Sequence, residues 1–166
     1  MLDSYKLNDM FFEADELIKQ NRIGEAQKIL ENIIVEDPAY VKAYNHLGWI
    51  YETKLKDFER AGQHYRKAIT FDPGYDAVYY NYAIVLSTVK KWSELEALLN
   101  DALKVPHINL STIYNEFGIM HEMCGKYDKA IDSYKEAVKY SLDLKNVSIY
   151  KDSILRCKQK QEIDNI

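Results

Sequence analysis

The feature that most constrains this chain is an internal repeat, because the sequence matches itself at offsets of 34 and 35 residues. The match runs along several lanes, each lane being the residues that occupy one position of successive repeats. The clearest lanes are Ala14, Gly48, Ala83 and Gly118; Ala26, Ala61, Leu95 and Ala130; Leu30, Tyr65, Leu99 and Tyr134; and Ile33, Ala68, Ala102 and Ala137. A unit of this length cannot bury its own apolar face, so neighbouring units must stack on one another.

The spacing inside each repeat is helical. In the second repeat, Tyr44, Leu47 and Tyr51 fall at i, i+3 and i+7, as one face of an amphipathic helix requires. A second apolar stripe follows after a short break, and a proline closes each of the first three repeats. The pattern predicts four helical hairpins, at residues 7–20 with 23–36, 40–54 with 57–71, 75–89 with 92–104, and 110–124 with 127–140.

At these positions the sequence resembles the tetratricopeptide repeat family, whose 34-residue unit carries a leucine-glycine pair, a tyrosine, alanines, an aromatic residue and a proline. The second repeat matches best, through Tyr44, Leu47, Gly48, Tyr51, Ala61, Tyr65, Ala68 and Pro73. The resemblance covers about residues 7–141, and its departures are Glu13, Leu95, His121 and one residue inserted near Leu55 to Phe58. It implies an all-α fold, a right-handed α-solenoid of four tetratricopeptide-type hairpins.

The end of the chain predicts a cap for this array. A helical stripe of Val147, Tyr150, Ile154 and Cys157 is followed by a polar run. Because the last repeat of a stack needs a polar covering element, we expect a C-terminal capping helix at about 144–161. The alternative is a degenerate fifth repeat without its second helix. The expected organisation is a single domain over residues 1–166, with repeats at about 7–39, 40–74, 75–107 and 110–142.

The overall charge narrows the class of partner. With 22 Lys and Arg against 26 Asp and Glu, the net charge is −4, the wrong sign for broad contact with nucleic acid or an anionic membrane. Charged residues interrupt residues 1–19, so we expect neither a signal peptide nor a membrane span. We therefore expect a cytoplasmic protein in which Cys124 and Cys157 are small packing residues.

Patterns for catalysis and metal binding are weak. The run His121-Glu122-Met123-Cys124 begins like the helix of a zinc protease, but Gly125 stands where the second histidine is needed. The acidic residues show no recognisable acid and base spacing, and no serine has the context of a nucleophile elbow. We expect no enzymatic activity, no metal and no cofactor.

The resemblance also implies a binding surface, because in this family the stacked first helices line a concave groove that holds an extended peptide or a helix of another protein. The corresponding residues of this chain are Phe11, Lys42, Asn45, Trp49, Glu52, Tyr80, Ile84, Asn115, Ile119 and Glu122. An exposed tryptophan in line with Ile84 and Ile119 is costly unless something covers it, and asparagines pair with a peptide backbone in both directions. The alternative is that these side chains touch one another, or that the C-terminal helix covers them.

Chaperone-binding members of the family hold a C-terminal carboxylate with lysine and asparagine side chains. The corresponding positions are Asn45, Trp49, Asn81, Thr112 and Glu116 in one register, and Phe11, Asp15, His46, Ala77 and Asn81 in the other. Neither set contains a lysine or an arginine, so a carboxylate clamp is not expected. We expect a monomeric, non-catalytic protein-protein interaction module whose partner is another protein. The alternatives are a secretion-type chaperone and a self-assembling structural subunit such as a homodimer.

Overall fold

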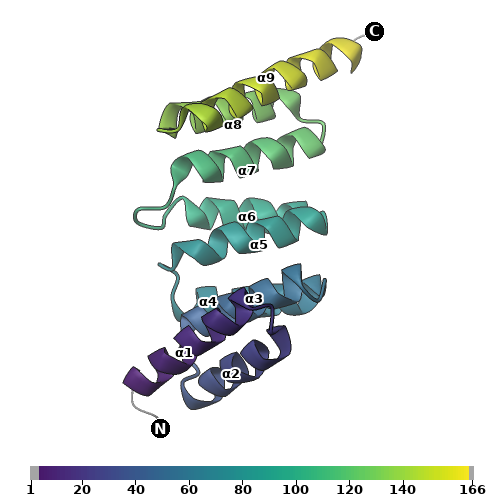
Figure 1. Cartoon of the computed structure of the whole chain (residues 1–166). Helices are drawn as coiled ribbons and strands as arrows, with labels where there is room; N and C mark the ends of the chain where they lie inside the picture. The colour runs from purple at the N-terminus through teal and green to yellow at the C-terminus, as the bar shows by residue number, and fades with distance from the viewer. Residues whose placement is uncertain (1–3, 165–166) are drawn as a thin grey trace. The chain divides into compact units, whose positions relative to one another are not determined.

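The chain is helical throughout the part that the structure describes. A computed structural model describes residues 4–164, and this range contains nine α-helices and no strand (Figure 1). The helices are α1 (Ser4–Lys19), α2 (Ile23–Glu36), α3 (Val41–Thr53), α4 (Phe58–Phe71), α5 (Asp76–Thr88), α6 (Trp92–Ala102), α7 (Leu110–Met123), α8 (Tyr127–Tyr140) and α9 (Leu144–Asp164). The expected all-α helical repeat is confirmed, while residues 1–3 and 165–166 of the predicted domain lie outside the described range.

The helix limits follow the predicted hairpins closely. α2 and α8 have the predicted bounds, whereas α1 begins at Ser4 instead of residue 7 and α9 continues to Asp164 instead of residue 161. Side chains fix two of the starts. The Asp57 carboxylate accepts a hydrogen bond from the Arg60 amide at 2.9 Å, and the Asn109 side chain accepts one from the Thr112 amide at 3.1 Å. Each bond satisfies an amide that the first turn of a helix leaves without a partner.

The turn inside each hairpin uses one residue with left-handed backbone. These residues are Asn21, Lys56, Lys90 and Gly125, with φ between 56° and 70°. The following amide donates to a carbonyl near the end of the preceding helix, in the pairs Arg22 to Leu17, Lys91 to Leu86 and Lys126 to His121, at 2.8 to 2.9 Å. In the second hairpin the bond joins Asp57 to Tyr51 and spans one residue more, which locates the insertion that the sequence indicates near Leu55 to Phe58.

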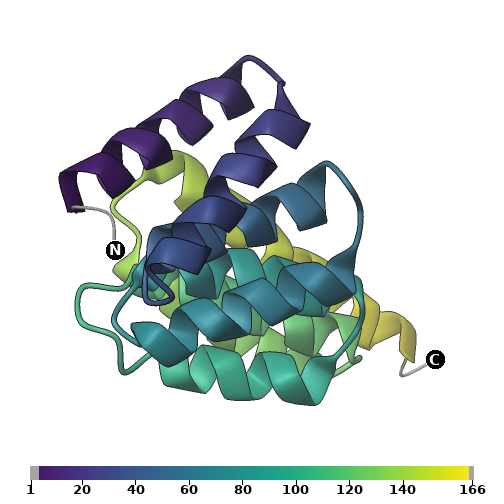
Figure 2. The ribbon, with the colours of Figure 1, turned by 90° about the horizontal axis from the view of Figure 1, so that it is seen from below.

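The described residues form two compact units whose boundary lies inside α5, between Val85 and Leu86. In the N-terminal unit, α1 packs against α2, α2 contacts α3, and α3 packs against α4 (Figure 2). In the C-terminal unit, α6 contacts α7, α7 packs against α8, and α8 packs against α9 (Figure 1). The predicted cap is thus a helix that lies on α8.

Close packing inside the second and fourth hairpins depends on glycine. A Cβ atom at Gly48 would overlap the ring of Tyr65, and one at Gly118 would overlap the ring of Tyr134. Both rings are fully buried, so each glycine leaves the space that a large side chain of the paired helix fills. Among the tyrosines of the hairpins, Tyr44, Tyr51, Tyr65, Tyr79, Tyr82 and Tyr134 are buried, whereas Tyr114 and Tyr127 are half-buried.

Candidate functional site

Two of the predicted groove residues, Asn45 and Trp49, line a cavity of about 240 Å³ in the N-terminal unit. The lining comes from three helices: Asp15 and Ile18 from α1, Asn45, His46 and Trp49 from α3, and Asn81 from α5. These helices open the first, second and third predicted hairpins. The cavity therefore lies on the helices that were expected to carry the groove.

Trp49 keeps part of its ring exposed beside this cavity. The rest of the side chain packs against the apolar core of the N-terminal unit, which includes Phe11 and Leu47. The ammonium nitrogen of Lys54 lies 5.5 Å from the centroid of the indole, a distance at which a cation is attracted to the aromatic face. The Thr53 hydroxyl donates to the Trp49 carbonyl oxygen at 2.7 Å. The indole is thus held in place by core packing and presents a partly exposed apolar surface.

Two amides face each other across α3 and α5. The Asn81 Nδ2 atom donates to Asn45 Oδ1 at 3.0 Å, and Asn45 is buried while Asn81 is half-buried. An asparagine side chain has two donor hydrogens and an oxygen with two lone pairs, so one bond between the two leaves each with further capacity. The pair can therefore also engage the amide and carbonyl of a peptide.

His46 and Asp15 form the ionisable part of the lining. The Nε2 atom of His46 lies 3.6 Å from Asp15 Oδ1, and its Nδ1 atom lies 3.1 Å from the Lys42 carbonyl oxygen. The His46 ring also packs edge-on against Phe11, with centroids 4.6 Å apart. Burial lowers the pKa of His46, whereas the hydrogen bond from Lys19 lowers the pKa of Asp15. At neutral pH the imidazole is therefore neutral and the carboxyl is ionised.

The remaining predicted residues of the N-terminal unit have different environments. Phe11 is buried beneath His46, and Lys42 is exposed at the start of α3. On α5, Tyr80 is half-buried, whereas Ile84 has 49% of its surface exposed. None of these four residues lines the cavity. Among these four residues, Ile84 has the exposed apolar surface that a residue lining a peptide-binding groove requires.

Glu52 was predicted to line the groove, but it does not lie on an exposed surface. Its side chain is buried, and the Tyr65 hydroxyl donates to Glu52 Oε2 at 2.7 Å. Burial raises the pKa of the Glu52 carboxyl, an effect that the bond from Tyr65 opposes. The sequence pattern missed this contact because it joins two different helices of the hairpin. Glu52 therefore links α3 to α4 inside the second hairpin.

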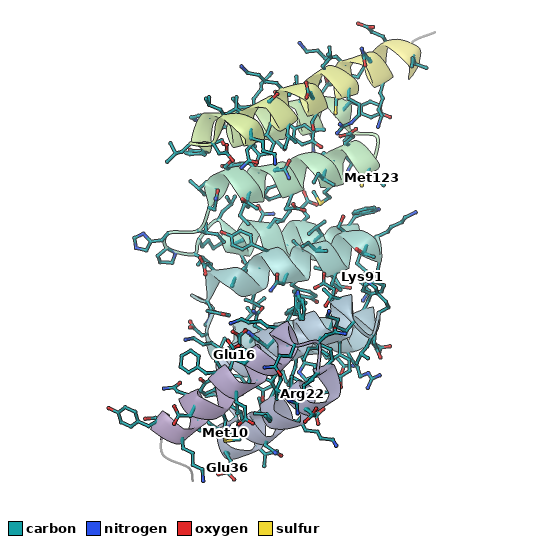
Figure 3. The ribbon with its side chains drawn as sticks, in the orientation of Figure 1. Met10, Glu16, Arg22, Glu36, Lys91 and Met123 are labelled. Carbon is teal, nitrogen blue, oxygen red and sulfur yellow. The ribbon has the colours of Figure 1, made fainter. Side chains whose placement is uncertain are left out.

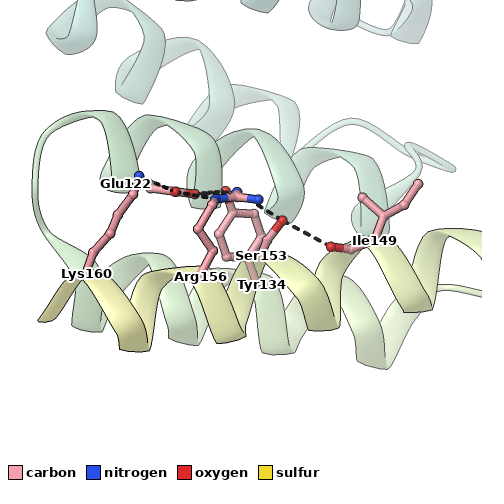
Figure 4. Close-up of polar contacts among 6 residues, drawn as sticks. All are labelled: Glu122, Tyr134, Ile149, Ser153, Arg156 and Lys160. Carbon is pink, nitrogen blue, oxygen red and sulfur yellow. Dashed lines mark hydrogen bonds and ion pairs between the residues drawn. The ribbon is translucent and has the colours of Figure 1, made fainter. Parts of the chain in front are cut away.

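Glu122 is likewise buried, and here the C-terminal helix is the reason. Its carboxylate accepts two hydrogen bonds from the Arg156 guanidinium at 2.7 Å, one from Lys160 at 2.8 Å and one from the Tyr134 hydroxyl at 2.8 Å (Figure 4). The bonds from Arg156 lower the pKa of Glu122 to about 2. The prediction that Glu122 lines an open groove is wrong, because α9 supplies two of its partners from 34 and 38 residues away.

Ile119 and Asn115 complete the predicted set on α7. Ile119 is half-buried against a small core that contains Tyr134 and Cys157. Asn115 is half-buried, with its Nδ2 atom 3.5 Å from Glu116 Oε1. Since Cys157 belongs to α9, the structure of the C-terminal unit favours the alternative considered from sequence, in which the C-terminal helix takes up part of this surface.

Four lining residues were missing from the predicted site: Asp15, Ile18, His46 and Asn81. The signal for three of them was present in the repeat register. Asp15 precedes Trp49 by 34 residues and therefore belongs to its lane, and His46 precedes Asn81 by 35 residues. Asp15, His46 and Asn81 are among the positions that were compared with a carboxylate clamp, but the predicted groove set did not include them.

Other chemistry has little support in the described range. Among residues 4–164, no group of three or more His, Cys, Asp or Glu side chains is placed to hold a metal ion, and no helix has the length and apolar character needed to cross a membrane. Both cysteines are free thiols, and burial raises the pKa of Cys157 to about 11. A second hollow, of about 570 Å³ in the C-terminal unit, lies between residues 107–111 and 140–146 and includes the fully exposed Leu142.

Comparison with known proteins agrees with this architecture. Two family models, both described as tetratricopeptide repeat, match residues 13–76 and 111–143, which together make up more than half of the chain. Comparison with curated protein sequences gave no match.

Several solved structures share the fold. They include a thermophilic TPR protein of Thermus thermophilus, with 19% identity, 90% of this chain and 81% of that chain covered, and a TM-score of 0.70. Pseudomonas aeruginosa pilF has 17% identity over 93% of this chain and 69% of its own, with a TM-score of 0.78. YrrB, described as a TPR protein with an unusual peptide-binding site, has 16% identity over 92% of this chain and 76% of its own, with a TM-score of 0.73. At identities this low, the structural similarity establishes a common fold alone.

Proposed function

The chain belongs to the tetratricopeptide repeat family, and we propose that it is a non-catalytic module that binds a segment of another protein against Trp49. Repeats of this family generally mediate protein-protein interactions. The bound segment is an extended peptide or a helix that lies over the cavity of the N-terminal unit. Ile84 extends the contact on α5, and Asn45 and Asn81 hold the backbone of the segment.

The observation that carries this proposal is the combination of a partly exposed indole and two amides around one cavity. Tryptophan is among the residues that dominate binding energy at protein interfaces, because its large rigid ring fills a pocket and excludes water. The amides supply the donor and acceptor that an extended backbone requires. YrrB, which shares the fold, is described with a peptide-binding site, and this supports the same use of the fold here.

The proposed module acts as a monomer in the cytoplasm. Its two cysteines are free, as expected in a reducing compartment. Light scattering at micromolar concentration tests the monomer directly. A stable dimer in which Trp49 is protected from solvent would instead support the self-assembling subunit.

The experiment that tests the proposal compares two variants of the full chain as baits in the lysate of the native host. Trp49→Ala removes the indole, and we expect it to weaken partner binding by about 2 kcal/mol or more, roughly 30-fold in the dissociation constant. Val35→Ala is the matched control, because Val35 is an apolar side chain on the second helix α2 with 78% of its surface exposed.

Circular dichroism first establishes that both variants melt like the wild type. The proposal expects a partner that wild type and Val35→Ala retain and Trp49→Ala loses. Equal recovery of the same partners by all three baits would exclude this face of the N-terminal unit as the binding site.

A further inference from the structure

Resting on the proposed function, we infer that the cavity binds a lysine or arginine side chain of the partner segment. Asp15 receives the cationic head, Trp49 and Ile18 cover the aliphatic stem, and Asn45 with Asn81 holds the adjoining peptide group. This preference is opposite in sign to a clamp for a C-terminal carboxylate. It follows from the charges, the walls and the size of the cavity.

The charge of the lining is the first argument. Of the six lining residues, Asp15 alone is ionised at neutral pH, since burial keeps His46 neutral. About a third of the Asp15 side chain is exposed, so a ligand reaches its carboxylate without unfolding of α1. A single carboxylate beside neutral amides and an imidazole attracts a cation and repels an anion.

The cations that the chain itself places there are the second argument. The Lys19 ammonium lies 2.9 Å from Asp15 Oδ2 and 2.7 Å from Glu16 Oε1; Figure 3 labels Glu16 on α1. The Lys54 ammonium lies over the Trp49 ring. The carboxylate proposed to receive the ligand cation and the indole wall beside it therefore each already attract an ammonium group. The Lys19 side chain is 61% exposed, and exposed ion pairs contribute little to stability, so an incoming cation replaces Lys19 at small cost.

The size and walls of the cavity fit one long side chain. Its volume of about 240 Å³ is below the range of roughly 300–1,000 Å³ that is typical of sites for small-molecule ligands. Lysine and arginine pack their methylene stems along apolar surface while the charged head remains close to water and to a counter-charge. Ile18 and Trp49 supply the apolar walls, and the partly exposed Asp15 supplies the counter-charge.

The charge of the surrounding unit adds a longer-range attraction. Residues 1–85 contain 14 Asp and Glu against 10 Lys and Arg, whereas residues 86–166 contain 12 of each. The whole net charge of −4 therefore belongs to the part of the chain that contains the cavity. Such an excess raises the local concentration of a basic segment and its association rate, most strongly at low salt.

Peptide pools test the inference directly. Each pool contains N-acetylated, C-amidated peptides in which the central residue is fixed as Lys, Arg, Gln or Glu and all other positions are uncharged. Dissociation constants for the full chain are measured by fluorescence polarisation. We expect the Lys and Arg pools to bind about tenfold tighter than the Gln pool, and the Glu pool to bind most weakly.

Three variants assign the preference to Asp15. Asp15→Asn should abolish the advantage of the Lys and Arg pools without changing the binding of the Gln pool. Lys19→Gln should lower the dissociation constants of the Lys and Arg pools by about two- to fivefold, because it removes the Lys19 ammonium that competes for Asp15. Lys6→Gln, with the same charge change on the same helix, should leave all constants unchanged. Melting temperatures confirm that each variant is folded.

The outcomes separate this inference from the proposed function. If binding depends on Trp49 but the Gln or Glu pool binds as tightly as the Lys pool, the preference for a cation is wrong and the proposed function stands. A Lys preference that survives Asp15→Asn overturns the role of Asp15. If no pool binds, or if Trp49→Ala changes no constant, the inference fails together with the site on which it rests.

Discussion

The second and fourth hairpins contain the same buried contact, but only in the fourth does a further helix supply charged partners to the glutamate. In each, a glutamate at the end of the first helix accepts a hydrogen bond from a tyrosine of the second helix, at 2.7 Å for Glu52 and Tyr65 and at 2.8 Å for Glu122 and Tyr134. In the fourth hairpin, α9 adds Arg156 and Lys160 to the carboxylate. The pKa is raised at Glu52 and lowered to about 2 at Glu122.

This difference shows that the repeat position fixes the hydrogen bond and the neighbouring helix fixes the charge. A buried carboxyl with a single neutral donor favours its protonated form, whereas an arginine and a lysine stabilise the carboxylate. In the C-terminal unit, Glu122, which was predicted to line the groove, instead holds the last helix. The N-terminal unit keeps a lined cavity on its first helices, and this contrast underlies the assignment of binding to that unit.

The largest effect should come from removal of α9. A chain that ends at residue 143 removes both cationic partners of Glu122 and exposes the apolar face of α8 around Tyr134. We expect aggregation or a marked fall in melting temperature, measured by circular dichroism and light scattering. A chain that ends at residue 161 keeps Arg156 and Lys160 and is the control. If the shorter chain melted like the full one, α9 would not be a structural cap.

The next largest effect should come from filling the space beside the buried tyrosines. Gly48→Leu and Gly118→Leu should each lower the free energy of unfolding by about 1–3 kcal/mol or more, because the added atoms overlap the rings of Tyr65 and Tyr134. Gly24→Ala is the control, since a Cβ there meets nothing within 4 Å. Urea unfolding gives the three values. A neutral result at Gly48 or Gly118 would contradict the close contact between the helices of that hairpin.

An isosteric pair of substitutions isolates the contribution of α9. Glu122→Gln should lower the free energy of unfolding by about 2 kcal/mol at pH 7, because Arg156 and Lys160 lose their anion. Glu52→Gln should change it by less than about 1 kcal/mol or stabilise the fold, because a neutral amide still accepts from Tyr65 without the cost of a buried charge. Equal losses of unfolding free energy in Glu122→Gln and Glu52→Gln would show that the contacts from α9 do not stabilise Glu122 more than Glu52.

The pH dependence of stability should differ in sign between the two glutamates. Glu122 has an ordinary pKa of 4.5 in the unfolded chain and about 2 in the fold, so its stabilisation is complete above pH 4.5 and is lost as the pH falls toward 2. For Glu52 the pKa is raised, so its stabilisation is complete below pH 4.5 and is lost as the pH rises through the higher value. Urea unfolding at pH 7, 4.5 and 3 should show a gap between wild type and Glu122→Gln that narrows only below pH 4.5.

Much of the fold was predictable from sequence because it depends on local period and repeat register. The lanes predicted stacked helical hairpins, and the helix limits followed from apolar spacing and prolines. The left-handed turn residues were less accessible, since Lys56 and Lys90 are not typical of that backbone region and adopt it because the turn requires it. Local pattern was therefore enough for the helices and insufficient for the turns.

The candidate site was only partly predictable. Trp49 and Asn45 were identified because their lanes project from the first helices, and the cavity does include them. The burial of Glu122 depends on Arg156, 34 residues later and on the far side of a predicted cap, so no repeat register reveals it. The position of a residue in the repeat predicts which face of the helix its side chain occupies. It does not predict which side chains distant in sequence contact it.

The most direct test of the central claim uses the two tryptophans, because Trp49 lies beside the cavity and Trp92 begins α6 in the other unit. The full chain, labelled with ¹⁵N, is titrated with the tightest-binding peptide of the pools while the two indole N–H signals are followed by NMR. The account predicts a large shift for Trp49, with amides of α1, α3 and α5 moving alongside, and little change for Trp92 and α9. Shifts confined to Trp92 and to helices α7 to α9, with Trp49 unmoved, would contradict it.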